Sequence, residues 1–260
     1  MIELLLVGIG TGNPEHLTLQ AIRALNSADL ILIPRKGMDK ADLADLRRSI
    51  CAEVVTNSAT RIVEFDLPRR DRSHADYRRG VDDWHQAIAK VWSDTIRSEL
   101  SGSGSVAFLI WGDPTLYDST LRIASRLEPA PNVRVIPGIT SIHALTASHA
   151  IPLTDIGAPF LVTTGRLLRD AGWPAGADTL VVMLDGDCAF QHLDPAGVTI
   201  WWGAYVGMAQ EIILAGALSE TAPRILHARA EAREKNGWIM DVYVLRRDSG
   251  QISSKAGLLA

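Results

Sequence analysis

Hydrophobic positions along the chain follow two alternating patterns. Short continuous apolar runs are typical of buried strands, whereas stretches with an apolar residue every three or four positions are typical of amphipathic helices. The first pattern predicts strands at residues 3–7, 30–33, 61–65, 106–111, 133–136, 160–163, 179–183, 199–204 and 238–245. The second predicts helices at residues 18–28, 39–50, 82–100 and 119–127. Strands that alternate with helices indicate an α/β fold.

The stretch at residues 105–120 combines an apolar strand with the residues of a tight turn. Gly112 follows the strand and allows a turn that a β-carbon would obstruct. Asp113 is a favourable helix N-cap, and Pro114 is a favourable first helical residue. The stretch therefore predicts a strand, a turn and a helix start, with backbone N–H groups at a strand end where small ligands often bind. An ordinary capped turn without a ligand is the alternative.

Two other glycine-containing loops follow predicted strands. Residues 8–14 read Gly-Ile-Gly-Thr-Gly-Asn-Pro, in which the third glycine comes one residue too early for the dinucleotide-binding pattern G-x-G-x-x-G. The second strand also lacks an acidic residue at its end, so we exclude a nicotinamide cofactor. The loop is either a tight structural turn or bare backbone against which a flat ligand lies. Residues 137–141 repeat the strand–turn–helix pattern, with Thr140 and Ser141 as helix caps or ligand contacts.

Cations are concentrated after the second and third predicted strands. Arg35 and Lys36 follow the second strand, and residues 69–79 contain five arginines and two aspartates. Guanidinium groups pair with carboxylates through two parallel hydrogen bonds, so one hypothesis is a carboxylate-binding rim. The alternative is a solvated surface loop.

Composition limits the classes of function. The 260 residues carry a formal net charge of −4, which gives no overall positive field for nucleic acid. No apolar run is long enough to span a membrane, and the first residues lack the basic segment of a secretory signal. Cys51 and Cys188 are expected as buried free thiols, which favours the reducing cytoplasm. No two histidines have the spacing of a metal site, so no metal is expected.

Three motifs together resemble the signatures of the tetrapyrrole methylases, in order and in spacing, and they cover most of the chain. They are residues 8–14 with Leu17-Thr18 and Ala21, Gly112-Asp113-Pro114 with Tyr117, and residues 137–141 continuing to Ile151-Pro152-Leu153. A further set of segments most resembles the branch of the family that acts in aerobic cobalamin synthesis. That set is residues 34–37, Asp42-Leu43, Leu46-Arg47 and residues 237–241.

The resemblance implies a two-domain α/β fold, usually in a homodimer, with S-adenosylmethionine in the cleft between the domains. Residues 1–114 would carry the glycine loop and a substrate trough, and residues 115–260 would form the second domain. Carried over by position, the cofactor-binding residues would be Gly112, Asp113, Leu116, Tyr117, Thr140, Ser141, Met183, Leu184, Ala204, Tyr205 and Met240. The substrate-binding residues would be Gly10, Thr11, Gly12, Arg35, Lys36, Arg69 and Arg70. Leu184 departs from the family, in which a small or polar residue usually follows the methionine.

The activity implied is C-methylation of a polycarboxylate tetrapyrrole, with S-adenosylhomocysteine as the second product. For the cobalamin branch, carbon 1 of precorrin-5 would take the methyl group and the acetyl unit would leave as acetate. Alternatives are methylation of another precorrin carbon, of uroporphyrinogen or of RNA ribose, and a non-catalytic tetrapyrrole carrier; the negative net charge disfavours RNA. Deacetylation needs an activated water molecule, and Asp113, Tyr117 and His143 are equal candidates for that role.

Overall fold

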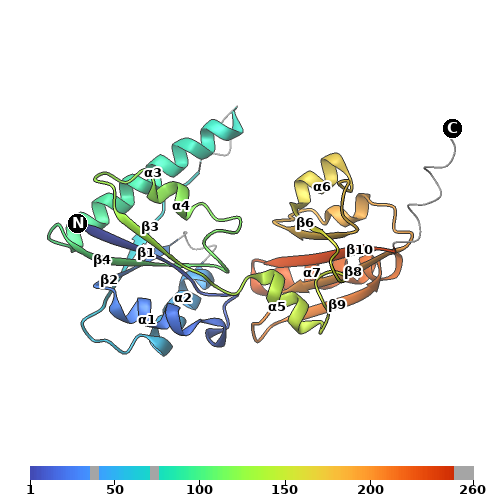
Figure 1. Cartoon of the computed structure of the whole chain (residues 1–260), viewed down its shortest axis with the longest axis horizontal. Helices are drawn as coiled ribbons and strands as arrows, with labels where there is room; N and C mark the ends of the chain where they lie inside the picture. Colours follow the sequence, from blue (N-terminus) through green and yellow to red (C-terminus); the bar gives the residue numbers. More distant parts are fainter. Residues whose placement is uncertain (36–40, 71–75, 249–260) are drawn as a thin grey trace. The chain divides into compact units, whose positions relative to one another are not determined.

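The computed structural model describes residues 1–35, 41–70 and 76–248. The chain divides into two compact units, Met1–Thr140 and Ser141–Ala260, which we call unit 1 and unit 2 (Figure 1). The sequence predicted a division after residue 114. The division falls later because the strand at residues 132–136 hydrogen-bonds within the first sheet and so belongs to unit 1.

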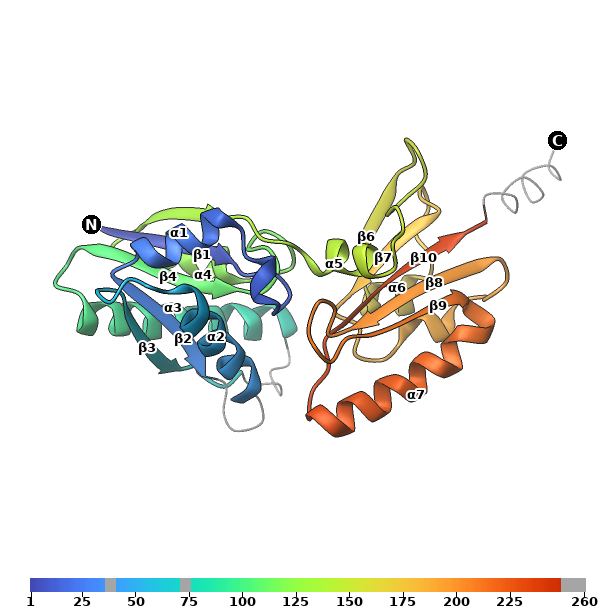
Figure 2. The same ribbon diagram turned by 90° about the horizontal axis from the view of Figure 1, so that it is seen from below.

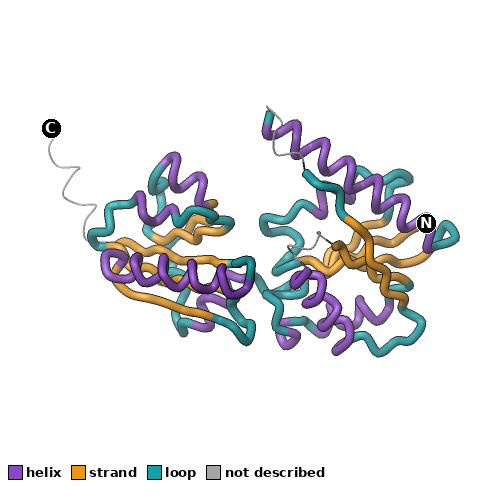
Figure 3. Tube along the Cα trace, turned by 180° about the vertical axis from the view of Figure 1, so that it is seen from behind, coloured by secondary structure: helices purple, strands orange, loops and turns teal. Residues whose placement is uncertain are grey.

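Unit 1 contains a parallel sheet with strand order β3-β2-β4-β1-β5. The strands are β1 Ile2–Gly8, β2 Leu30–Arg35, β3 Arg61–Asp66, β4 Gly104–Ile110 and β5 Asn132–Ile136. Helices cover both faces of this sheet (Figure 3). They are α1 Leu19–Ser27, α2 Ala41–Val54, α3 Tyr77–Glu99 and α4 Thr120–Ala124, with a short 3₁₀ helix, η1, at Pro14–His16.

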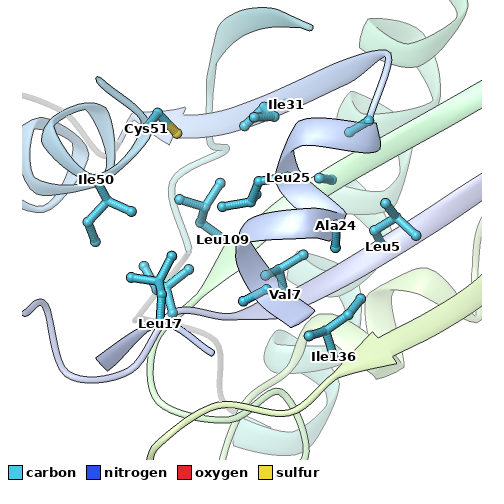
Figure 4. Close-up of a cluster of buried hydrophobic side chains, with 14 of the residues drawn as sticks. Leu5, Val7, Leu17, Ala24, Leu25, Ile31, Ile50, Cys51, Leu109 and Ile136 are labelled. Carbon is cyan, nitrogen blue, oxygen red and sulfur yellow. The ribbon is translucent and has the colours of Figure 1, made fainter. Parts of the chain in front are cut away.

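Strand β1 divides the interior of unit 1 into two hydrophobic clusters. Leu5 and Val7 point into the cluster shared with α1 and α2 (Figure 4). Leu4 and Leu6 point the opposite way, into the cluster shared with α3 and α4. Because both faces of a parallel sheet are covered, its strands are continuous apolar runs, and this is why the sequence predicted them well.

Unit 2 contains a mixed sheet with strand order β6-β7-β10-β8-β9. Strands β6 and β7 are parallel, and the other neighbours are antiparallel. The strands are β6 Phe160–Thr164, β7 Thr179–Met183, β8 Val198–Ala204, β9 Ile212–Ala217 and β10 Asp241–Arg247. The helices are α5 Ser141–Ser148, α6 Gly165–Ala171 and α7 Leu218–Asn236, with a 3₁₀ helix, η3, at Ala189–His192. Helix α7 packs along β8 and β9 (Figure 2).

Two local expectations were wrong. No helix starts at Asp113 and Pro114, because the residues after Gly112 form turns and α4 begins only at Thr120. The final strand begins at Asp241 rather than at residue 238, because Gly237 ends α7 in the left-handed conformation. The first residues of the helix predicted at 39–50 lie outside the described residues.

Candidate functional site

Three loops meet at the carboxyl ends of β1, β4 and β5, where a glycine of each approaches the backbone of another. A β-carbon on Gly138 would lie 2.1 Å from the carbonyl oxygen of Gly112 and 2.8 Å from the carbonyl carbon of Gly8. A β-carbon on Gly8 would lie 2.6 Å from the amide nitrogen of Gly138. Such distances leave no room for a side chain, so the sequence needs glycine at both positions.

Asp113 connects two of these loops through its carboxylate. Its Oδ1 accepts hydrogen bonds from the amide and the hydroxyl of Thr115, at 2.8 and 2.5 Å. Its Oδ2 accepts a hydrogen bond from the amide of Gly138, at 3.0 Å. Burial raises the pKa of this carboxyl, but the hydrogen bonds from Thr115 and Gly138 outweigh burial and hold the pKa below its usual value. Asp113 therefore stabilises a turn and a contact between loops, instead of capping a helix.

The first glycine loop is joined to the same site by backbone hydrogen bonds. The amide of Gly112 donates to the carbonyl of Gly10 at 2.7 Å, and the amide of Gly10 donates back at 3.4 Å. Gly10 has φ of +72°, and a β-carbon on it would lie 2.6 Å from the β-carbon of His16. Gly10, Thr11 and Gly12 are all buried, and Thr11 is hydrogen-bonded to His16. This packing favours the tight structural turn over bare backbone; contact with substrate stays a prediction.

The other residues expected from the second and third loops are Leu116, Tyr117, Thr140 and Ser141. Tyr117 has φ of +50°, and its side chain is 45% exposed. A β-carbon on Gly112 would come within 3.7 Å of Thr140 Cα, so Thr140 borders the Gly112 turn. Thr140 ends unit 1, and Ser141 is the first residue of α5 in unit 2.

In unit 2, the expected cofactor residues lie at the ends of β7 and β8 and before β10. Leu184 and Tyr205 have φ of +53° and +51°, a conformation that residues other than glycine rarely adopt. The amide of Tyr205 donates to the carbonyl of Met240 at 2.9 Å, so the ends of β8 and β10 are tied together beside Ala204. Leu184 is 65% exposed and follows the partly buried Met183.

A buried polar network supports these loop ends in unit 2. Asp241 Oδ2 accepts hydrogen bonds from Arg229 Nε at 2.9 Å and from Trp202 Nε1 at 3.1 Å. Arg229 Nη2 also donates to the carbonyl of Asp185, and the hydroxyl of Tyr243 donates to the Asp185 carboxylate at 2.6 Å. Burial raises the pKa of Asp241, although Arg229 opposes this rise. The network therefore fixes the turn that carries Leu184 and the strand start next to Met240.

The expected substrate cations have different environments. Arg35 donates two hydrogen bonds to the carboxylate of Asp66, both at 3.0 Å, and also lies 3.8 Å from Glu64. Lys36 lies outside the described residues, as do residues 71–75 of the arginine-rich segment. Arg69 is exposed and Arg70 is partly buried. The guanidinium of Arg35 is thus paired with carboxylates of the chain itself. The sequence did not predict this pairing.

Unit 1 also contains a pocket that was not predicted from the sequence. Its volume is about 260 Å³, and Arg47, Trp84, Trp111, Tyr117 and Asp118 are among the residues that line it. One signal was available, because Arg47 lies four residues after Leu43 and three before Ile50, which places an arginine on the inner face of α2.

The described residues contain neither a cluster of metal-ligating side chains nor a membrane-spanning helix. No group of three or more His, Cys, Asp or Glu side chains that could hold a metal ion occurs among them. In the same part of the chain, none of the helices is sufficiently long and apolar to cross a membrane.

Comparison with known families identifies the class of protein. The model of the Tetrapyrrole (Corrin/Porphyrin) Methylases matches residues 3–222. The chain belongs to this family, and it is a methyltransferase with the two-domain α/β fold that the three motifs implied.

Individual relatives agree with this assignment. The chain is 50% identical over 251 residues to precorrin-6A synthase (deacetylating) from Sinorhizobium sp, covering 95% of this chain and 96% of that protein. It is 39% identical to the cobalamin synthesis related protein CobF from Corynebacterium diphtheriae, with a TM-score of 0.80 and coverage of 95% and 99%. Uroporphyrin-III C-methyltransferase from Thermus thermophilus, solved with S-adenyl homocysteine, is 20% identical with a TM-score of 0.57, and covers 94% of this chain and 97% of its own. This last likeness shows that the fold is shared.

Proposed function

We propose that this chain methylates precorrin-5 at carbon 1, with S-adenosylmethionine as methyl donor, and releases acetate to give precorrin-6A. The observation that carries the proposal is the 50% identity to a precorrin-6A synthase (deacetylating) over nearly the full length of both chains. Three glycine loops packed against one another at the ends of parallel strands support it, because this edge of an α/β sheet is where ligands bind.

The residues of the second and third loops fit the methionine part of S-adenosylmethionine. Gly112 adopts φ of +60° and carries no side chain, so no side-chain atoms of its own keep a ligand away from this turn. The carboxylate of Asp113 keeps its negative charge at neutral pH, and a carboxylate has unused lone pairs after three hydrogen bonds. Leu116, Tyr117, Thr140 and Ser141 complete this part of the proposed site.

The loop ends of unit 2 fit the adenosine part. Leu184 presents an exposed apolar side chain of the kind that packs on an adenine ring. Met183, which precedes Leu184, and Met240, which precedes β10, are both partly buried. Ala204 and Tyr205 are buried, so their contribution is through backbone groups. The strained conformations of Leu184 and Tyr205 are typical of residues held in place at functional sites.

S-adenosylmethionine, when bound, supplies an electrophilic methyl group on a positively charged sulfur. Methyl transfer requires an in-line approach more than an acid or a base, so the task of the loops is to hold the donor and the ring carbon in that line and exclude water. Deacetylation breaks the bond between the ring carbon and the acetyl carbonyl carbon. Water supplies one oxygen of acetate, and the acetyl carbonyl supplies the other. The electron pair of the broken bond stays on the ring, and the two protons of water are released. Asp113, Tyr117 and His143 stay equal candidates for water activation.

Incubation with labelled S-adenosylmethionine and a panel of precorrins and uroporphyrinogen tests this function. Precorrin-5 should gain one labelled methyl group and lose an acetyl unit, with one equivalent of acetate in solution. Methylation of a different substrate without acetate would point to another member of the family. Tetrapyrrole binding without any methyl transfer would point to the carrier alternative.

We further expect the protein to act as a homodimer in the cytoplasm. Cys51 and Cys188 are both buried and free, as expected in a reducing compartment. Light scattering coupled to size exclusion tests the dimer, since a 28.2 kDa chain would then elute with twice that mass. A monomer at micromolar concentration would contradict it.

A further inference from the structure

The pocket in unit 1 contains an arginine, Arg47, that forms no ion pair with any described residue. Arg47 Nε donates to the carbonyl of Leu109 at 3.1 Å, and Nη1 donates to the carbonyl of Leu43 at 3.2 Å. Within the described residues, Nη2 makes no hydrogen bond, and no carboxylate lies within salt-bridge distance of the guanidinium. The guanidinium carbon lies 4.8 Å from the centre of the Trp111 ring, so the cation is packed against an aromatic wall.

The surroundings of Arg47 make its positive charge costly. Burial lowers the pKa of the guanidinium to about 10, although the carboxylate of Asp118 opposes this effect. The neighbouring thiol of Cys51 supplies no negative charge at neutral pH, because burial raises its pKa to about 11. A desolvated cation of this kind is stabilised when an anion binds to it, and a guanidinium prefers carboxylates.

The size and walls of the pocket restrict the anion. A volume of about 260 Å³ is too small for a macrocycle and suits a short side chain or a free small acid. The walls are largely apolar, with Trp84, Trp92 and Phe108 among them. Such walls favour a carboxylate that carries an alkyl group over a fully hydrated inorganic anion.

The pocket is next to the loop assigned to the cofactor. Tyr117, Asp118 and Ser119 all line it, and Tyr117 comes four residues after Asp113 in the chain. A group bound at Arg47 would therefore lie beside the segment that holds the methionine part of the donor. Asp118 is the competing negative charge among the lining residues, and its Oδ1 accepts a hydrogen bond from the amide of Thr120 at 2.6 Å.

We propose that this pocket binds a short aliphatic carboxylate through the guanidinium of Arg47. The carboxylate is either a side-chain arm of the tetrapyrrole or the acetate that the reaction releases, so this second half of the inference rests on the proposed function. Asp118 then lowers the affinity of the pocket for this carboxylate, because its charge repels the same anion that Arg47 attracts.

Titration of the full chain with sodium propionate and sodium acetate, at constant ionic strength, tests the pocket without any turnover. Trp84, Trp92 and Trp111 line the pocket, so tryptophan fluorescence should report saturable binding, with a Kd of about 1 mM for so small a ligand. Sodium chloride at the same ionic strength should give no such signal. Equal effects of chloride and propionate would overturn the proposal.

Three variants separate binding from structural effects. Arg47→Gln should weaken propionate binding at least tenfold, whereas Arg48→Gln, which changes an exposed arginine paired with Asp45 and Glu64, should not alter it. Asp118→Asn should tighten binding several-fold, because it removes the repulsion while the amide oxygen still accepts from Thr120. Tighter binding is a result that a merely structural role of Asp118 would not produce. Unchanged or weaker binding by Asp118→Asn would overturn the proposal, even if Arg47→Gln fails to fold.

Steady-state kinetics with precorrin-5 then distinguish the two sources of the carboxylate. If the pocket holds a substrate arm, propionate should compete with the substrate, and Arg47→Gln should raise KM with little change in kcat. If it holds released acetate, acetate should inhibit without competing, and Arg47→Gln should change kcat instead. A wild-type protein that binds propionate but does not convert precorrin-5 would contradict the proposed function. It would still support the proposed carboxylate site at Arg47.

Discussion

At the residue scale, Asp113 shows how a side chain can have a role other than the one its sequence position favours. The pair Asp-Pro after glycine is typical of a helix start. In the structure the carboxylate instead accepts three hydrogen bonds, one of them from Gly138, which is distant in the sequence. Asp113 therefore stabilises the contact between two loops. Replacing it should affect ligand binding more than the stability of a helix.

Asp113→Ala should lower the free energy of unfolding by about 1–3 kcal/mol, because the amide of Gly138 loses its acceptor. It should weaken S-adenosylmethionine binding by a larger factor than Thr115→Val, which removes one hydroxyl donor to the same carboxylate and serves as the matched control. Calorimetric titration of folded variants measures both affinities. Equal affinities for wild type and Asp113→Ala would exclude Asp113 from the cofactor site.

The stability supplied by Asp113 depends on pH in a defined direction. Its folded-state pKa is lowered, so the contribution is complete above the ordinary carboxyl pKa of about 3.9 and is lost as the pH falls below that value. The difference in unfolding free energy between wild type and Asp113→Asn should accordingly be constant from pH 7 to pH 5 and shrink below pH 4. A difference that shrinks near neutral pH would contradict this assignment.

At the scale of elements, the carboxyl ends of β1, β4 and β5 meet through backbone atoms. Gly8, Gly112 and Gly138 are close enough that no side chain fits at the first or the third. The close approach brings the three family motifs, which are separated by long intervals in the sequence, to one edge of the sheet. The geometry of each loop consequently depends on the other two.

Gly138→Ala should destabilise unit 1 by about 1–3 kcal/mol or more, because its β-carbon would lie 2.1 Å from the carbonyl oxygen of Gly112. Gly186→Ala is the matched control, since a β-carbon there meets no atom within 4 Å, and it should change stability by about 0.5 kcal/mol at most. Thermal and denaturant unfolding measure both. A tolerated Gly138→Ala would mean that the loops can separate at little cost.

The packing also changes what Gly10→Ala is expected to do. If the first glycine loop contacted only the substrate, this variant would leave cofactor binding intact and abolish methyl transfer. Gly10 is bonded to Gly112 and has φ of +72°, so the substitution should disturb the Gly112 turn as well. Gly10→Ala therefore cannot separate the substrate loop from the cofactor loop.

In unit 2, the ion pair between Arg229 and Asp241 is the strongest candidate for a structural support of the cofactor loops. The two side chains are only 12% and 8% exposed, so Arg229→Met should cost about 3–5 kcal/mol by leaving Asp241 buried without its partner. Arg169→Met breaks exposed pairs with Asp170 and Asp187 and should cost far less, because solvent screens these charges. Denaturant unfolding compares the two variants. A similar small cost for both would show that the buried pair contributes little.

At the scale of the whole molecule, positive charge is concentrated in a few segments although the net charge is negative. The chain has a net charge of −4, yet Arg35 and Lys36 stand together at the end of β2 and five arginines follow β3 at residues 69–79. Asp66 and Glu64 neutralise Arg35, whereas Arg69 is exposed at the end of the described segment before residue 71. A polycarboxylate substrate would therefore be attracted by a limited region of the surface.

The double substitution Arg69→Gln and Arg70→Gln should raise KM for the tetrapyrrole and reduce the dependence of KM on salt, because fewer cations attract its carboxylates. Affinity for S-adenosylmethionine should stay the same. Arg35→Gln should have a smaller effect, since Asp66 already occupies its guanidinium. Kinetics at several salt concentrations check this, and an equal loss of cofactor affinity would show that the segment is structural.

The sequence by itself determined the class of protein and much of unit 1. Continuous apolar runs mark β1 and β4 because both faces of a parallel sheet are buried, and this pattern is local. The three glycine motifs identify the family because a short turn next to backbone atoms restricts the residues that fit. These features depend on neighbours in the chain, so they can be read without the fold.

Only the tertiary structure decided which distant residues act together. The Asp113–Gly138 hydrogen bond, the exposure of Leu184 and the lack of an ion pair between Arg47 and any described residue arise from segments far apart in the sequence. The boundary between the units depended on the pairing of β5 with β1, and the mixed sheet of unit 2 depended on antiparallel pairing of β10 with β7 and β8. Pairing and burial are relations between segments, and no local pattern specifies them, because each segment is compatible with several partners.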